Sequence, residues 1–205
     1  MLFAAPVMLV TALVISLDGG PVFFRQKRAG LRGIEFTILK FRSMRPHGFT
    51  TAELITLHGQ VTHHHPDVTP IGRWIRRYKI DELPQLLNVI KGDMSIIGPR
   101  PTVPEQVKEY TPYQLRRLDV RPGLTGWAQV NGGTEFSWPE RILLDVWYVA
   151  HRRVSLDAWI ILKTAWVVVF GENRNVAALV KAEVFARRCS NESAAQRASV
   201  LTQPA

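Results

Sequence analysis

The sequence predicts an α+β fold, a small and mostly helical globular domain with one short β-hairpin. Two short segments, 21–27 and 35–44, predict paired strands joined through Gly30 and Gly33. Segments with apolar residues at helical spacing follow over most of 69–170, and several open with a proline after a capping residue. The length of 205 residues, with 46% hydrophobic and 21% charged residues, suits one domain with its own core, with or without a membrane-binding part.

The chain is strongly basic. Its formal net charge is +9 and its isoelectric point is near 10.2. This balance favours an anionic partner, which charge alone leaves open between nucleic acid, anionic lipid and a phosphorylated substrate. Cys189 is the single cysteine, so an intrachain disulfide is excluded.

The N-terminal run from Leu2 to Leu17 carries no charge. It is shorter than the roughly 20 apolar residues that span a bilayer, and it lacks the basic start of a signal peptide. Pro6 predicts a kink, and a kinked apolar helix can enter one leaflet and turn back. A buried core helix is the alternative. Basic residues near such a segment favour the cytoplasmic side; here they are Arg25, Lys27, Arg28, Arg32, Lys40, Arg42 and Arg45.

The segment from His47 to Asp67 is polar and rich in turn-forming residues, which predicts a loop. His63, His64 and His65 stand side by side within it. Adjacent histidines do not easily face one metal ion, and no cysteine or carboxylate cluster accompanies them. We therefore expect a solvated loop here and not a metal site.

The first predicted helix begins at Thr69-Pro70, with Thr69 as N-cap, and runs to about Tyr78. Asp81 is the expected N-cap of a second helix, which ends at Gly92. Pro84 lies in the first turn of that helix, where its missing N–H costs little. The helical spacing is carried by Leu83, Leu86, Leu87 and Ile90.

The remaining segments follow in chain order. A helix is expected from Thr111-Pro112 to about Val120, then loop, strand and turn over 121–133, and a helix that opens at 137–140. The segment from Asp157 to Phe170 is almost wholly apolar. Its Trp159 and Trp166 share one face, which suits either an interfacial helix or a core helix. From Ser190 onward we expect a disordered tail.

Asp81 and Glu82 are adjacent carboxylates at the expected start of a helix, where the helix dipole favours the ionised form. An ionised, fixed carboxylate can act as a nucleophile or a Mg²⁺ ligand, although aspartate at an N-cap is usually structural. The surroundings favour chemistry, because Pro99 and Pro101 fix the backbone around Arg100, and guanidinium groups suit phosphate oxygens. The cations that precede the pair are Arg73, Arg76, Arg77 and Lys79.

Five segments in a fixed order resemble the hallmark motifs of the bacterial sugar transferase family, the monotopic polyprenyl-phosphate phosphoglycosyl transferases. The resemblance covers about residues 1–175. The segments are Phe36-Thr37-Ile38-Leu39-Lys40-Phe41-Arg42-Ser43-Met44, Ile80-Asp81-Glu82-Leu83-Pro84-Gln85, Gly92-Asp93-Met94-Ser95-Ile96-Ile97-Gly98-Pro99-Arg100-Pro101, Arg121-Pro122-Gly123-Leu124-Thr125-Gly126-Trp127-Ala128-Gln129-Val130-Asn131-Gly132 and Leu144-Asp145-Val146-Trp147-Tyr148-Val149.

For the architecture, the resemblance implies a re-entrant membrane helix in 1–20, a catalytic domain in 21–175, and a helix with a disordered tail in 176–205. The re-entrant helix would enter and leave on the cytoplasmic face of the bacterial inner membrane, with anionic lipid beside it and Pro6 at its kink. The family usually has Ser where Ala5 stands, and a further helical half before the proline, so the segment here is expected to be truncated.

For the chemistry, the resemblance implies two steps with Mg²⁺ as cofactor. Asp81 attacks the β-phosphate of a UDP-sugar and releases UMP, and the phospho-sugar then passes to undecaprenyl phosphate. Glu82 would join Asp81 in holding Mg²⁺, and Arg76 and Arg100 would lie near the phosphates. Gly133 departs from the family, which often has Arg there. The remaining implied substrate contacts are Lys40, Arg42, Pro99, Pro101, Arg121, Gln129, Asn131 and Asp145, and a structural ion pair is the alternative for Asp145.

Two other readings stay open. One is an inactive membrane anchor or scaffold of the same fold. The other is a basic nucleic-acid-binding module, since two helices joined by a turn lie between Arg73 and Ile90. That second reading explains neither the apolar N-terminal run nor the carboxylate pair, and we expect no nucleic-acid partner.

Overall fold

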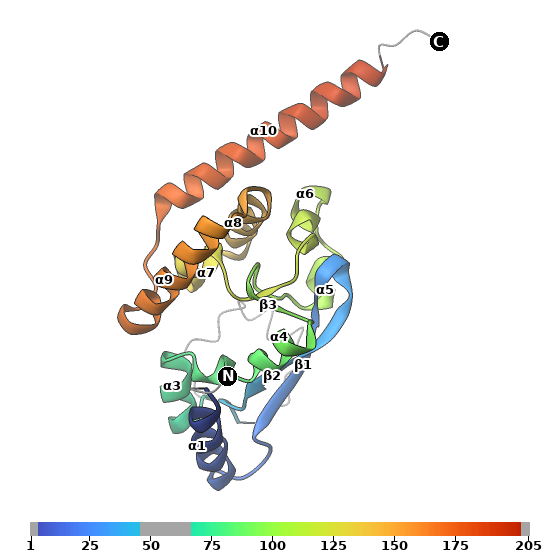
Figure 1. Cartoon of the computed structure of the whole chain (residues 1–205). Coiled ribbons are helices and arrows are strands. Elements are labelled where there is room, and N and C mark those ends of the chain that lie inside the picture. The colour runs from blue at the N-terminus through green and yellow to red at the C-terminus, as the bar shows by residue number, and fades with distance from the viewer. Residues whose placement is uncertain (1–3, 46–66, 202–205) are drawn as a thin grey trace.

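The computed structural model describes residues 4–45 and 67–201, with side chains up to residue 192. Most of the loop predicted at 47–67, including the three histidines, lies outside the described residues. Figure 1 shows the order of the elements along the chain. They are α1 (Ala4–Leu17), β1 (Phe23–Ala29), η1 (Leu31–Gly33), β2 (Glu35–Phe41), α3 (Pro70–Arg77), η2 (Ile80–Glu82), α4 (Gln85–Lys91), β3 (Ser95–Ile97), α5 (Pro104–Val107), α6 (Pro112–Leu115), η3 (Arg116–Leu118), β4 (Gly123–Thr125), α7 (Trp127–Val130), η4 (Gly133–Glu135), α8 (Trp138–His151), α9 (Val154–Phe170) and α10 (Val176–Leu201).

The predicted hairpin is confirmed. Strands β1 and β2 pair antiparallel over their full lengths, from Phe23 opposite Phe41 to Ala29 opposite Glu35. The turn between them includes Gly33, whose φ of 79° lies in the left-handed region that glycine adopts without strain. Because side chains alternate across a strand, β2 turns Phe36 and Ile38 toward α4 and β3, where they pack with Met94.

Helix α1 packs against the hairpin end and α3 through a small apolar cluster of Ile15, Phe41 and Ile75. Pro6 lies in the first described turn of α1, where its missing N–H breaks no hydrogen bond within the described helix, and the kink at Pro6 stays a prediction. Over the described residues, no helix has both the length and the apolar character that crossing a bilayer requires.

Helix α3 begins as predicted, with the Thr69 hydroxyl accepting a hydrogen bond from Gly72 N–H at 2.9 Å. The prediction that Asp81 caps the next helix is wrong. Asp81 lies inside the 3₁₀ turn η2, and α4 follows with Pro84 at its N-cap. The proline explains the shift, because its fixed φ and missing N–H suit the entry to a helix. Gly92 ends α4 with φ 89°, as expected.

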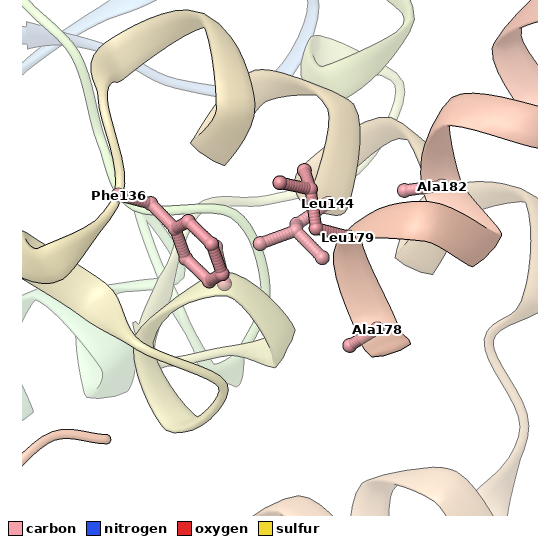
Figure 2. Packing of buried hydrophobic residues seen from close by; sticks show 6 residues of the cluster. Phe136, Leu144, Ala178, Leu179 and Ala182 are labelled. Atoms are coloured by element: carbon pink, nitrogen blue, oxygen red, sulfur yellow. The ribbon is translucent and has the colours of Figure 1, made fainter. Parts of the chain in front are cut away.

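The second half of the chain is built around α8. A core that includes Ala128, Leu144 and Leu179 joins α7, α8 and α10, and Figure 2 shows Leu144 and Leu179 facing each other across it. Another cluster joins α7, α8 and α9. The short parallel pair β3–β4 connects the two halves of the molecule, through Ser95 opposite Gly123.

One expectation for this half needs correction. The segment after Gly126 forms the short helix α7 where only loop, strand and turn were expected. Helix α10 continues to Leu201 and projects from the body of the molecule in Figure 1, and the disordered tail stays a prediction. In α9, Trp159 contacts Trp127 at a ring distance of 5.3 Å and Trp166 is largely exposed, so the choice between an interfacial helix and a core helix stays open.

Candidate active site

The carboxylate pair lies in the turn between α3 and α4. Lys79 precedes it with a φ of 57°, a left-handed conformation that lets the chain reverse into η2. Helix α4 is fixed to the hairpin by the buried amide of Asn88, which accepts from Leu39 N–H at 3.1 Å and donates to Thr37 C=O at 2.8 Å. This attachment places Asp81 and Glu82 beside strand β2.

Glu82 is held by two cations. Its Oε1 accepts from Lys40 Nζ at 2.7 Å and from an Arg100 guanidinium nitrogen at 2.7 Å. Burial opposes the charge of Glu82, but Arg100 and Lys40 outweigh it and hold its pKa well below its usual range. The same ion pair raises the pKa of Arg100. Glu82 is therefore an ionised carboxylate that is already committed to two partners.

Asp81 differs from its neighbour. It is 8% exposed and, among the described residues, no cation lies within ion-pair distance of its carboxylate. Burial first, and the negative charge of Glu82 second, raise its pKa above the usual value, against the weaker pull of Lys40, Arg76 and Arg100. The expectation that a helix N-terminus favours the ionised form is therefore wrong for Asp81, because the residue is in a buried turn and not at an N-cap.

Two further cations complete the cluster. Arg76 is half-buried, lies within electrostatic range of Asp81 and Glu82, and donates to the Ser43 hydroxyl at 3.5 Å. Arg28, on β1, was not among the expected site residues. Burial and the positive charge of Arg100 lower its pKa to about 10, and Glu82 acts in the opposite direction. Four cations thus surround two adjacent carboxylates, an arrangement that favours binding of a polyanion.

Asp145 is part of a second ion pair behind this cluster. Arg117 donates to its carboxylate at 2.5 Å, and both side chains are almost completely buried, 1% and 2% exposed. The same guanidinium donates to the backbone carbonyl of Arg100 at 2.9 Å and to the Tyr110 hydroxyl at 2.8 Å. Of the two interpretations of Asp145, this geometry favours the structural ion pair. The pair positions Arg100 through the hydrogen bond from Arg117 to the Arg100 carbonyl.

The structure brings together five of the expected site residues: Asp81, Glu82, Arg76, Arg100 and Lys40. The others lie in different settings. Pro99 and Pro101 are buried beside Arg100, where they shape its backbone. Arg42 binds Asp18 and the carbonyl of Ile15 at the end of α1.

Three expected substrate contacts lie on or near β4 and α7. Arg121 is exposed, and Gln129 donates to Leu124 C=O at 3.0 Å. Asn131 is fully buried, and its amide oxygen accepts from Asn175 and from Lys163. Contact of these side chains with a substrate stays a prediction. For Asn131, burial favours a structural role.

Glu172, after α9, is a site residue that the sequence did not single out. Its carboxylate accepts from Lys79 Nζ at 2.9 Å and from both the N–H and hydroxyl of Thr134 at 2.6 Å. A Cβ on Gly133 would lie 2.4 Å from Glu172 Oε2, so glycine at this position leaves the room that the carboxylate occupies. Where the resemblance led us to expect Arg, Gly133 leaves room for Glu172, whose carboxylate binds the side chain of Lys79. Only the unusual Gly133 signalled this in the sequence.

Arg28 and Arg117 were also missed, and each for a physical reason. Arg28 is one of seven basic residues between 25 and 45, and nothing local distinguishes the one that faces the cluster. Arg117 lies beside Arg116 in a short helical turn, and only the tertiary packing buries one of the two.

The comparison with known proteins agrees with these motifs. The family described as bacterial sugar transferase matches residues 1–171. The chain is 43% identical over 183 residues to the uncharacterized sugar transferase EpsL of Bacillus subtilis, covering 87% of this chain and 86% of EpsL. It is 42% identical to the UDP-glucose:undecaprenyl-phosphate glucose-1-phosphate transferase of Xanthomonas campestris pv. campestris, over 82% of this chain and 35% of the relative.

A third relative is the undecaprenyl-phosphate glucose phosphotransferase of Komagataeibacter xylinus, 40% identical over 84% of this chain and 34% of its own length. The chain thus spans most of EpsL but about a third of the two named glucose transferases. With the matched region including α1 and every residue of the carboxylate and cation cluster, the chain belongs to the bacterial sugar transferase family.

Proposed function

We propose that this chain is a phosphoglycosyl transferase that moves a sugar phosphate from a UDP-sugar to undecaprenyl phosphate, and that it begins the synthesis of an exopolysaccharide or another glycan. The relatives named for this reaction support it. The observation that carries it is the asymmetry of the carboxylate pair: Glu82 is fixed by two cations, while Asp81 beside it has a carboxylate without an ion pair among the described residues.

The first step would be attack of an Asp81 carboxylate oxygen on the β-phosphorus of the UDP-sugar. A bond from the aspartyl oxygen to phosphorus forms, the bond to the bridging oxygen breaks, and UMP leaves with that electron pair. Arg100, Arg76 and Lys40 would stabilise the negative charge that develops on the phosphate oxygens and the departing UMP. Glu82 keeps two of these cations in place through its ion pairs.

In the second step, a phosphate oxygen of undecaprenyl phosphate would attack the same phosphorus. The aspartyl–phosphorus bond breaks, which frees Asp81 and leaves a lipid-linked diphosphate sugar. Dividing the transfer in this way lets a water-soluble donor and a lipid acceptor react one after the other with the same side chain.

Asp81 and Glu82 are compatible with a Mg²⁺ ion that takes few ligands from the protein. No group of three or more potential metal-binding side chains exists within the described ranges. Mg²⁺ usually takes one or two carboxylates, with substrate phosphates and water completing its shell. Asp81 would hold it, helped by Glu82 Oε2, which also accepts from Arg100 at 3.5 Å. A bound Mg²⁺ would neutralise phosphate charge and oppose the burial and the Glu82 charge that raise the pKa of Asp81. Chelation is expected to abolish transfer, measured as UMP release with and without EDTA, and restored by added Mg²⁺.

We also propose that the protein works on the cytoplasmic face of the bacterial inner membrane. Helix α1 exposes Leu9, Val10 and Leu17, and α9 exposes Leu162 and other apolar side chains. Large exposed apolar patches next to basic residues are typical of proteins that bind anionic bilayers. Fractionation of cells tests this, and recovery of the protein wholly in the soluble fraction would contradict it.

The decisive experiment traps the covalent intermediate. The full chain is incubated with a UDP-sugar labelled in the β-phosphate, without lipid acceptor, and protein-bound label is measured. Wild type should take up label, and Asp81→Asn should take up none. Asp119→Asn, which removes an exposed carboxylate outside the cluster, should label like wild type. Equal labelling of wild type and Asp81→Asn would overturn the assignment.

A further inference from the structure

A cavity of about 520 Å³ lies between the second half of α9 and the segment that follows it. This volume is in the range of small-molecule sites, which usually combine an apolar wall with a few polar groups. The cavity is lined by Val130, Lys163, Trp166, Val167, Phe170, Gly171, Glu172, Asn173, Arg174 and Asn175.

One wall of the cavity is apolar and continues onto the outside of α9. Trp166 and Phe170 lie against each other with ring centroids 4.1 Å apart, yet they remain 61% and 66% exposed. Leu162 and Val169 extend the same apolar surface beyond the cavity. An apolar ligand longer than the cavity could therefore follow this surface outward.

The other wall carries a cation with no acidic partner. Lys163 is the only basic residue of α9, and among the described residues its ammonium contacts Asn131 Oδ1 at 3.2 Å and the Trp159 ring at 4.7 Å, with no carboxylate in ion-pair range. Burial lowers its pKa, as expected for an ammonium that is partly removed from water without a counter-ion. Arg174, also on this wall, is paired with Glu140. Lys163 therefore lacks the anion that a ligand could supply.

The cavity adjoins the candidate active site through Glu172. This residue lines the cavity, binds Lys79 two residues before Asp81, and is close enough to Arg100 to raise its pKa. Glu172 is thus a contact that the cavity shares with the Lys79 side chain, two residues before Asp81.

We propose that this cavity binds the phosphate end of the isoprenoid phosphate acceptor, with Lys163 paired to the phosphate and the first isoprene units lying on Trp166 and Phe170. The inference rests on the proposed function for the identity of the acceptor. A nucleotide explains the site less well, because the cluster around Asp81 already supplies cations for a diphosphate, whereas the exposed apolar surface beyond the cavity suits a long hydrocarbon chain.

Binding can be measured without turnover, with the full chain in detergent and farnesyl phosphate as the probe, against farnesol as the uncharged analogue. Wild type should prefer the phosphate. Lys163→Gln should weaken farnesyl phosphate binding about tenfold, the effect of one hydrogen bond to a charged group, and leave farnesol binding unchanged. Lys163→Arg should retain most of the preference. Lys181→Gln, which removes an exposed lysine from α10, is the matched control and should bind like wild type.

Trp166→Ala tests the apolar wall, and since the indole is largely exposed the fold should tolerate the change. It should weaken farnesyl phosphate and farnesol alike. An unchanged phosphate preference in Lys163→Gln would overturn the proposal, as would equal displacement of the probe by phosphatidic acid or by inorganic phosphate, because the site would then take any phosphate.

Release of UMP in the absence of acceptor separates this proposal from the proposed function. Lys163→Gln should leave that first step unchanged and raise the acceptor KM in the complete reaction. Loss of the first step in Lys163→Gln would place the lysine at the donor and refute the acceptor site. If wild type releases no UMP but binds farnesyl phosphate through Lys163, the proposed reaction fails while the binding site stands.

Discussion

Two carboxylate–arginine pairs in the described part of the chain differ in how completely they are closed to solvent. Asp145 and Arg117 are both almost inaccessible, and the arginine also donates to the Tyr110 hydroxyl and to the backbone carbonyl of Arg100. Glu82 and Arg100 are paired at a similar distance, but the Arg100 side chain remains 39% exposed and a second carboxylate, Asp81, lies beside the pair.

This difference separates a structural ion pair from a binding site. In the closed pair each charge is balanced by one partner, so nothing further can bind there. In the open cluster, Arg28, Lys40 and Arg76 add positive charge around the Asp81–Glu82 pair, and a polyanion can approach. Burial of an ion pair is thus no sign of catalysis by itself; an accessible group of several titratable side chains with perturbed pKa values is the informative feature.

The largest expected effect is on the open cluster. Asp81→Asn should reduce UMP release by at least about a thousandfold, as expected when a covalent nucleophile is removed. The stability of the Asp81→Asn variant should increase, although its activity falls. The pKa of Asp81 is raised in the fold, so its ionisation opposes folding once the pH rises through that pKa. The variant should therefore melt at a higher temperature than wild type at pH 7, and a lower melting temperature would contradict the environment described for Asp81.

Changes to the Asp145–Arg117 pair should lower the free energy of unfolding. Asp145→Asn leaves the Arg117 charge buried without a counter-ion, which costs about 3–5 kcal/mol. Chemical denaturation of the full chain in detergent measures this. Replacing both partners, with Asp145→Leu and Arg117→Met, should cost less than the single change. A double variant as unstable as the single one would show that packing, not the lone charge, is responsible.

Glu82→Gln should have an intermediate effect, lowering transfer by about 10²-fold because Arg100 and Lys40 lose the carboxylate that orients them. The pH dependence of stability gives an independent check. The pKa of Glu82 is depressed in the fold, so its stabilising contribution is complete above the unfolded value of 4.5 and is lost as the pH falls through the lower folded pKa. Glu82→Gln should lack this loss of stability at acidic pH. If its stability below pH 4.5 followed that of wild type, the ion-pair assignment would be refuted.

The smallest expected effect is at Gly133. An alanine there meets Glu172 Oε2 and adopts a φ of +44°, so Gly133→Ala should cost about 1–2 kcal/mol and displace the carboxylate from Lys79. Glu172→Gln is the matched variant, since it keeps the volume and weakens the contact to Lys79. Both changes should lower kcat more than donor KM if Glu172 positions the turn before Asp81. If kcat is unchanged in both variants, Glu172 does not position the turn before Asp81.

The sequence alone determined the hairpin, the cap at Thr69, the end of α4 at Gly92, and the family, because turn residues, capping residues and long motifs act through neighbours in the chain. It also named the central residues Asp81, Glu82 and Arg100. It failed where a residue's state depends on distant contacts. Asp81 was expected to be an ionised N-cap, and the tertiary structure placed it in a buried turn beside Glu82 instead.

The tertiary structure alone decided which of the many basic residues serve the site. Arg28 and Arg117 look like their neighbours in sequence, and they differ only because β1 turns one toward Glu82 and α8 buries the other against Asp145. It also paired Gly133 with Glu172, which are 39 positions apart in the chain. Local rules govern backbone shape, but charge pairing and burial act through space, so they emerge only when the chain has folded.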